Sequence, residues 1–294
     1  MLKGQNKDTS IANIFIFIVI TLVYFALAKT KITLEVLSNA DEYKAFSKHS
    51  HYVMIFYFML IVLIQFGFNT STMINKCGGS ASSNMASAAW STFMPWVFIF
   101  GVMMGILIIF PGFKSAFSDV VGYFVVSKSA STLLSDLLVN TDIDNQVNDS
   151  DSKDTKESKK SMQESADAIV KLLGNVSILI NQIVPGNFMH NWDTLVPLMK
   201  DKYKNNLQSQ ETLEKQRALL DIVVTRDNIG EGMWYLYTAI LLISIVQFNI
   251  SSTKCELNTS LQEEKYNDYL DKSKSKEKMK ETANSVAYKI NSSV

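Results

Sequence analysis

The sequence predicts an all-α membrane protein, with about four transmembrane helices and a helical extramembrane module between the third and the fourth. Two observations predict this class. Apolar residues make up 47% of the 294 residues and are collected in four blocks, and a block of roughly 17–25 such residues is enough for a helix to cross a bilayer. The four blocks, at 11–28, 52–68, 86–110 and 232–250, also contain no Asp, Glu, Lys, Arg or His, which are rare in segments that face lipid.

Residues 1–110 form the N-terminal membrane region, and three spans are expected there, at about 11–28, 52–68 and 86–110. A signal peptide is the competing interpretation of the first block. That block is longer than the apolar core of a signal peptide, and Lys29 follows it where a small-residue cleavage site would be expected. We therefore expect an uncleaved first span.

The third span carries residues that are expected to determine its packing. Pro95 removes a backbone donor and favours a kink. Gly101 and Gly105 lie four residues apart, so another helix can approach their shared face closely, although this spacing is also common in spans by chance. Trp90 and Trp96 lie toward one end of the span, where indole rings favour the headgroup region. We assign both tryptophans to the membrane interface.

Residues 111–229 are expected to form an interfacial and extramembrane helical module. A Pro-Gly pair at its start ends the third span, because this pair breaks a helix. Phe113, Phe117 and Phe124 then recur at helical spacing, which is typical of a helix that lies in the membrane interface. The packed face of a soluble helix is the alternative. Within the module, 140–165 is polar with alternating charge, which predicts a disordered loop.

The fourth span is expected at 230–250, and a polar C-terminal tail follows at 251–294. Trp234 lies near the start of this span and is assigned to the membrane interface. Four spans place both termini on one side of the membrane. Lys and Arg are more frequent near the span ends on the other side, so the positive-inside rule favours a cytosolic module.

The two cysteines, Cys77 and Cys255, fall on the same side of the membrane in this topology, each near a span end. Under the charge argument that side is the oxidising one, where a disulfide can form. The sequence leaves two alternatives open. One is a disulfide that ties the end of span four to the turn ahead of span three, and the other is a pair of free thiols.

The sequence carries no recognisable catalytic motif, and we expect a protein without enzymatic activity. A nucleophile would need a base and an orienting group, yet His190 has no Ser or Cys motif near it. His49 and His51 lack a nearby third ligand, so no metal is assigned, and no cofactor is expected. The formal net charge is zero, so direct nucleic-acid binding is not expected. Spans without ionisable residues disfavour a pump, whereas a simple pore lined by Ser, Thr and Asn stays open.

Short motifs spread over about residues 70–255 resemble a known family. They are Cys77-Gly78-Gly79, Pro95-Trp96, Phe110-Pro111-Gly112-Phe113-Lys114, Phe117-Ser118, Gly122-Tyr123, Leu179–Pro185, Asn187-Phe188, Trp192, Arg226–Ile229 and Trp234-Tyr235. This succession is similar to the membrane-spanning minor capsid or inner-membrane virion proteins of nucleocytoplasmic large DNA viruses, the giant viruses.

The resemblance implies a structural virion protein that lies in the inner lipid membrane beneath an icosahedral capsid, and in host endomembranes during assembly. The implied partners are the lipid bilayer and other capsid and membrane proteins of the virion, and a homo-oligomer is compatible with this role. The alternative function is that of a small pore-forming or membrane-remodelling protein, also without enzymatic activity.

Overall fold

The computed structural model describes residues 5–138, 176–253, 255, 263 and 266–276. The predicted loop at 140–165 and most of the polar tail lie outside these residues. The described chain is helical apart from turns and one isolated β-bridge between Leu138 and Met199. Four of its helices are long and apolar enough to cross a membrane. The expected class, an all-α membrane protein, is therefore confirmed.

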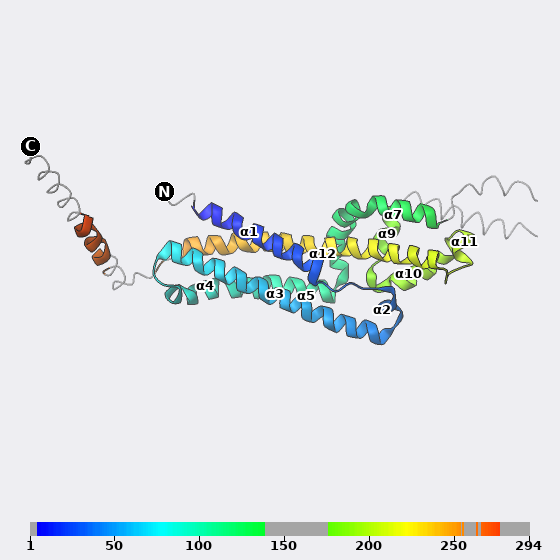
Figure 1. Ribbon diagram of the computed structural model, residues 1–294, viewed down its shortest axis with the longest axis horizontal. Coiled ribbons are helices and arrows are strands. Elements are labelled where there is room, and N and C mark those ends of the chain that lie inside the picture. The colour runs from blue at the N-terminus through cyan, green and yellow to red at the C-terminus, as the bar shows by residue number, and fades with distance from the viewer. Residues whose placement is uncertain (1–4, 139–175, 254, 256–262, 264–265, 277–294) are drawn as a thin grey trace, which may run out of the picture.

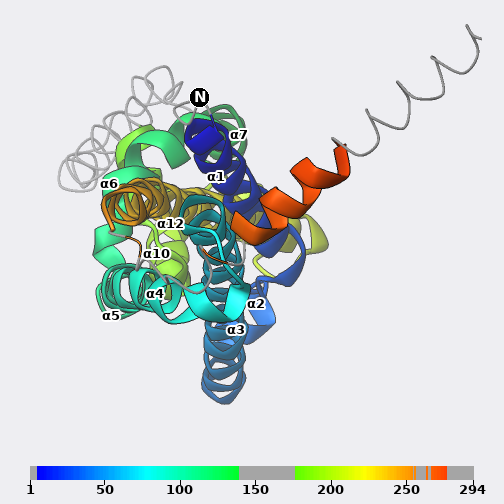
Figure 2. The ribbon, with the colours of Figure 1, turned by 90° about the vertical axis from the view of Figure 1, so that its left-hand side faces the viewer.

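The four candidate spans lie side by side and alternate in direction in an elongated bundle (Figure 1). Seen along the bundle, the last span lies next to both the first and the third (Figure 2). The spans are α1 (Gln5–Val23) with its continuation η1 (Tyr24–Ala28), α3 (Ala40–Cys77), α4 (Ala81–Pro95) with η2 (Trp96–Gly101) and α5 (Val102–Ile109), and α12 (Gln210–Ser252). The short α2 (Leu34–Ser38) connects the first span to the second.

Hydrogen bonds between polar side chains join the spans inside the bundle. A buried polar group in a bilayer has no water to bond, so it is stabilised by a partner on another helix. One partner in every pair comes from α3, which makes α3 the helix to which the other three are tied. The pairs are Asn13 with Gln65, at 2.9 and 2.7 Å, Thr21 with Tyr57, at 2.7 Å, Thr92 with Asn69, at 2.9 Å, and Gln247 with Asn69, at 3.2 Å.

The extramembrane module packs against the N-terminal part of α12 (Figure 1). Its core joins side chains from several short helices, among them Leu134, Ile180, Trp192 and Leu219. The elements are η3 (Pro111–Lys114), α6 (Ser115–Phe117), η4 (Ser118–Gly122), α7 (Tyr123–Leu137), α9 (Val176–Gln182), η8 (Pro185–Asn187), α10 (Phe188–Leu195), η9 (Val196–Leu198) and α11 (Asp201–Lys204).

Helix α12 belongs to both parts of the molecule. The sequence pattern separates a module that ends at 229 from a span at 230–250, but the structure has one unbroken helix of 43 residues across this boundary. At 1.5 Å per residue it is about 65 Å long, roughly twice the thickness of the hydrocarbon core. Ser209 caps its N-terminus by accepting from the Thr212 N–H. The module is therefore joined to the membrane bundle without a hinge in this helix.

Candidate functional site

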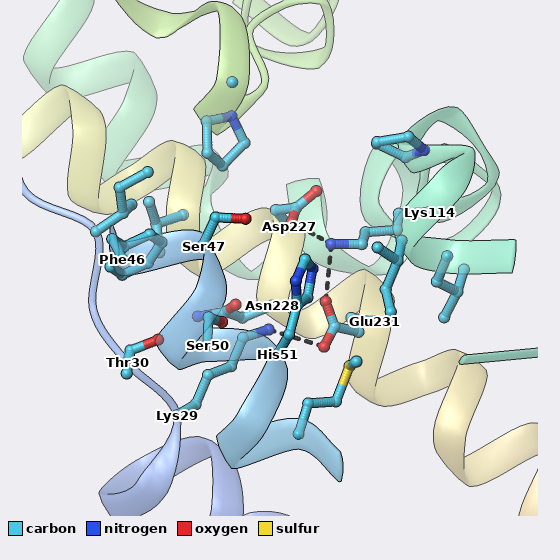
Figure 3. A pocket seen from close by; sticks show the side chains of 18 of the residues that line it. Lys29, Thr30, Phe46, Ser47, Ser50, His51, Lys114, Asp227, Asn228 and Glu231 are labelled. Atoms are coloured by element: carbon cyan, nitrogen blue, oxygen red, sulfur yellow. Dashed lines mark hydrogen bonds and ion pairs between the residues drawn. The ribbon is translucent and has the colours of Figure 1, made fainter. Parts of the chain in front are cut away.

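Four charged side chains meet where the bundle joins the module (Figure 3). The Lys29 Nζ lies 2.9 Å from Oε1 of Glu231, and the Lys114 Nζ lies 2.8 Å from its Oε2. Lys114 also bonds Oδ2 of Asp227 at 3.0 Å. The hydroxyl of Tyr235 donates to Oε1 of Glu231 at 2.9 Å. This charged junction thus pairs two ammonium groups with two carboxylates.

The members of the charged junction come from the points where apolar runs end. Lys29 directly follows η1, Lys114 closes the short helix after α5, and Glu231 precedes the apolar part of α12. Their charges are largely removed from water, and Glu231 is only 6% exposed. A buried charge is tolerated only when it is paired and hydrogen-bonded. The junction therefore depends on the correct assembly of three separate chain segments.

The surroundings change the pKa of both lysines. Burial disfavours the charged form and lowers the pKa of Lys29, although the Glu231 carboxylate opposes this effect. Burial acts in the same direction on Lys114, but the carboxylates of Glu231 and Asp227 outweigh it and raise the pKa of Lys114. Lys114 therefore keeps its positive charge between the two carboxylates.

A second polar contact fastens the module to α12. The Arg226 guanidinium is only 1% exposed. It donates to the carbonyl oxygens of Ile180 and Ile183, the latter at 2.9 Å, and to Oδ1 of Asn181 at 3.3 Å. These acceptors lie at the C-terminal end of α9, where helical carbonyls have no partner within the helix. Arg226 therefore caps α9 from the side of α12.

Two glycines allow η4 and α12 to cross in direct backbone contact. A Cβ atom added at Gly230 would lie 2.6 Å from the Cβ of Ser118, and one added at Gly122 would lie 2.5 Å from the carbonyl oxygen of Arg226. Any larger residue would force the two helices apart. This crossing extends along α12 from Arg226 to Gly230, directly before Glu231, and holds the segment after Lys114 beside the charged junction.

A cavity of about 300 Å³ lies beside the charged junction. Lys29, Lys114, Asp227 and Glu231 are part of its wall (Figure 3). Its remaining walls come from α3, the end of α5 and the module segment 184–186. The cavity therefore lies between the bundle and the module and is partly open to the surroundings.

The structure brings together three of the residues that the sequence assigns to the membrane interface. The Trp234 Nε1 donates to the Phe113 carbonyl oxygen at 2.9 Å, and the rings of Phe117 and Trp234 are 5.0 Å apart. Phe124 lies apart from them on α7 and is 80% exposed. The aromatic side chains after the third span thus pack partly on α12, and Phe124 remains free of that contact.

The third span shows one departure from expectation. Trp90 is 68% exposed, whereas Trp96 is fully buried at 0% and packs against Phe17 and Phe100. The assignment of Trp96 to the membrane interface is therefore corrected: its ring fills the bundle core. The π-helical segment η2 starts directly after Pro95, where the missing backbone donor breaks the α-helical pattern.

The two glycines of the third span differ in their surroundings. A Cβ atom added at Gly101 would lie 3.3 Å from the ring of Phe58 on α3, so this glycine faces a neighbouring span. A Cβ added at Gly105 would meet no atom of the described chain within 4 Å. Gly101 and Gly105 therefore do not form one face that packs closely on another helix of the described chain.

At the opposite end of the bundle, Cys77 and Cys255 form a disulfide that closes a separation of 178 residues. Lys76 lies next to it, and its Nζ donates to the carbonyl oxygens of Ile250, Ser251 and Thr253. An ammonium group at a helix C-terminus satisfies carbonyls that lack partners and complements the helix dipole. The end of α12 is thus held against the end of α3 by one covalent and several polar contacts.

Neither the charged junction nor the glycine crossing was identified from the sequence. The partners are far apart in the chain, since 113 residues separate Lys114 from Asp227. One local signal was present: Glu231 stands between Gly230 and Gly232 at the edge of an apolar block. A carboxylate in that position needs a partner, but the sequence does not show which lysines provide it.

The fold and the charged junction define an all-α membrane protein with four candidate spans and a helical module fixed to one end of the bundle. No protein-family model, no curated protein and no solved structure matches the chain. Its functional assignment therefore depends on its own residues and geometry.

Proposed function

We propose that the protein is a structural component of a virion, a minor capsid protein that links the inner lipid membrane to an icosahedral capsid. The observation that carries this proposal is the continuity of α12, which runs unbroken from the module into the bundle. A linking protein needs a part that stays in the bilayer, a part that protrudes, and a stiff connection between them. The chain combines all three, and its motifs resemble virion membrane proteins of giant viruses.

The contacts around α12 favour a role in which the module is held rigidly on the membrane bundle. The charged junction, the Arg226 cap and the glycine crossing all join the module to the membrane end of this helix. Each contact would be lost if the module moved as a separate domain on a flexible linker. In this proposal, the module presents a surface of fixed orientation to capsid proteins while the bundle stays in the lipid.

The interior of the bundle favours the structural role over a pore formed by a single chain. Large side chains fill the space between the spans, and the polar groups there bond to each other instead of lining a channel. The filling residues are Phe17, Tyr57, Trp96, Phe100 and Tyr235. Purified protein in liposomes is accordingly expected to leave ion permeability unchanged, and a steady ion flux would favour the pore instead.

Purified particles test the proposal. Quantitative mass spectrometry is expected to find the protein in a constant ratio to the major capsid subunit across independent preparations. Amine cross-linking of intact particles should join the exposed module lysines Lys128 and Lys204 to capsid subunits. The exposed Lys274, in the tail that follows the far end of α12, is the control and should give no capsid cross-link. Absence of the protein from purified particles would contradict the proposal.

A further inference from the structure

The cavity beside the charged junction lies at the level where hydrocarbon gives way to headgroups. Lys29 follows the first span, His51 precedes the apolar part of the second, and Lys114 follows the third. Glu231 marks the corresponding point of the fourth span. All four residues line the cavity. Because every apolar run stops at its wall, the cavity is placed at the membrane interface and not inside the bilayer or out in the module.

The cavity has an apolar wall and a polar wall, just as a lipid molecule has apolar chains and a polar headgroup. Its apolar wall is formed by residues at the ends of the second and third spans: Met54, Met104, Leu107 and Ile108. Its polar wall adds hydroxyl, imidazole and amide groups to the charged junction: Thr30, Ser47, Ser50, His51 and Asn228 (Figure 3). Its volume of about 300 Å³ is at the lower end for small-molecule sites, so it holds a headgroup but not the acyl chains.

Several polar atoms of this wall have unused bonding capacity within the described chain. The Thr30 Oγ1 has no hydrogen-bond partner, but it is fully buried, so a molecule in the cavity does not reach it. The Lys29 ammonium has three donors; one bonds Glu231, and the nitrogen also lies 4.7 Å from the centre of the Phe25 ring. Asp227 bonds Lys114 through Oδ2, which leaves its Oδ1 available to a donor. The wall thus offers both a donor set and an acceptor.

We propose that this cavity binds the headgroup of a zwitterionic phospholipid that carries a primary ammonium group. The phosphate accepts from Lys29, and the ammonium donates to Oδ1 of Asp227. The charges of the wall already balance, with two lysines and two carboxylates. A headgroup with no net charge keeps this balance in a poorly solvated place, whereas a purely anionic headgroup adds an uncompensated charge. A quaternary ammonium cannot donate a hydrogen bond to Asp227.

Lipid retention by the full-length protein tests this proposal. The protein is reconstituted in nanodiscs with equal amounts of phosphatidylethanolamine, phosphatidylcholine and phosphatidylglycerol, and retained lipids are identified by native mass spectrometry. Phosphatidylethanolamine is expected to exceed phosphatidylcholine by about tenfold, the factor that one charge-assisted hydrogen bond provides. Equal retention of the two zwitterionic lipids, preferential retention of phosphatidylglycerol, or no retained lipid would each overturn the proposal.

Substitutions of residues that line the cavity test whether the lipid binds there. Ser47 and Ser50 both line the cavity, so Ser47→Trp and Ser50→Trp each fill it, and both should reduce phosphatidylethanolamine retention by about tenfold or more. Ser129→Trp on an exposed part of α7 is the matched control and should retain the lipid. Unchanged retention in both cavity variants would place the lipid elsewhere and contradict the proposal.

A last experiment distinguishes binding of the membrane lipid from binding of its soluble headgroup. Soluble glycerophosphoethanolamine offers the same phosphate and ammonium without acyl chains, and it should not bind detectably to the detergent-solubilised protein. Binding of that molecule as strongly as the lipid would contradict the assignment to a membrane lipid. These experiments use purified protein without particles, so their failure is distinguishable from failure of the virion role.

Discussion

The carboxylate of Glu231 accepts from three donors that come from different parts of the chain: Lys29, Lys114 and Tyr235. Each donor alone would form an ordinary contact. Together they neutralise a carboxylate that is almost fully buried. Removal of this one negative charge leaves two ammonium groups close to each other, with only Asp227 to compensate them.

Glu231→Gln is therefore expected to reduce the free energy of unfolding by about 3–5 kcal/mol, as for a broken buried ion pair. Thermal unfolding in detergent micelles measures this change. Glu35→Gln is the control, because Glu35 pairs with Arg217 on the exposed surface and such pairs contribute little. Equal unfolding temperatures for the two variants would show that the charged junction does not stabilise the fold.

Gly122 and Gly230 leave no space for a side chain at the crossing of η4 and α12. Gly230→Ala and Gly122→Ala are each expected to destabilise the protein by about 1–3 kcal/mol, because overpacking shifts the backbone. The added Cβ atoms would lie 2.6 Å and 2.5 Å from atoms of the crossing helix. Gly112→Ala is the control, since no atom lies within 4 Å of its added Cβ. Thermal unfolding should separate the first two variants from the third.

At the scale of elements, α3 organises the bundle through its polar partners. Asn13 and Gln65 bond in both directions between α1 and α3. A double-mutant cycle with Asn13→Leu and Gln65→Leu is expected to give a coupling energy of about 0.6–1.7 kcal/mol, the range for such pairs in membranes. Steric trapping or thermal unfolding in micelles measures it. Asn13→Leu combined with Thr92→Val is the control, and should be additive within about 0.5 kcal/mol.

The attachment of α9 depends on Arg226. Arg226→Lys keeps the positive charge but loses the planar fork that bonds two carbonyl oxygens at once. Hydrogen exchange of the 176–182 amides is therefore expected to accelerate by about tenfold or more, as for a lost charge-assisted bond. Arg217→Lys, at an exposed pair, should leave α9 unchanged. Equal exchange in both variants would exclude the cap as a stabilising contact.

The presence of each membrane helix could be predicted from the sequence, whereas the residues at which the helices begin and end could not. Apolar blocks identify the lipid-facing part of a helix, but α3 starts at Ala40, well before its apolar part at 52–68. Hydropathy carries no signal for such polar extensions. In α12, Gly230 and Gly232 resemble a break. Gly230 instead provides the close contact with Ser118, a reason that only the tertiary structure reveals.

At the scale of the whole molecule, the sequence predicts the class but not the site. Composition alone places four helices in a membrane, because the hydrophobic effect acts on each segment separately. The charged junction requires Lys29, Lys114 and Glu231 to meet, and such contacts depend on how the spans are arranged. Trp96 illustrates the same limit: an indole in an apolar block suits either an interface or a core, and its burial decides between them.

The disulfide connects the second span to the last and so affects the whole bundle. Its separation of 178 residues gives an upper limit of about 5 kcal/mol by the loop-entropy relation. Spans remain helical in a bilayer even when their packing is lost, so the expected loss on reduction is smaller, about 2–4 kcal/mol. Unfolding with and without reductant measures it. Cys77→Ser/Cys255→Ser should match the reduced protein and show no response to reductant.

In mechanical terms, α12 is a rod about 65 Å long, roughly twice the thickness of a hydrocarbon core. Its far end is clamped to α3 by the disulfide and by Lys76. A sideways force on the module is therefore transmitted along α12 to its contacts with α3 at the far end. We accordingly expect the module and the bundle to tilt together.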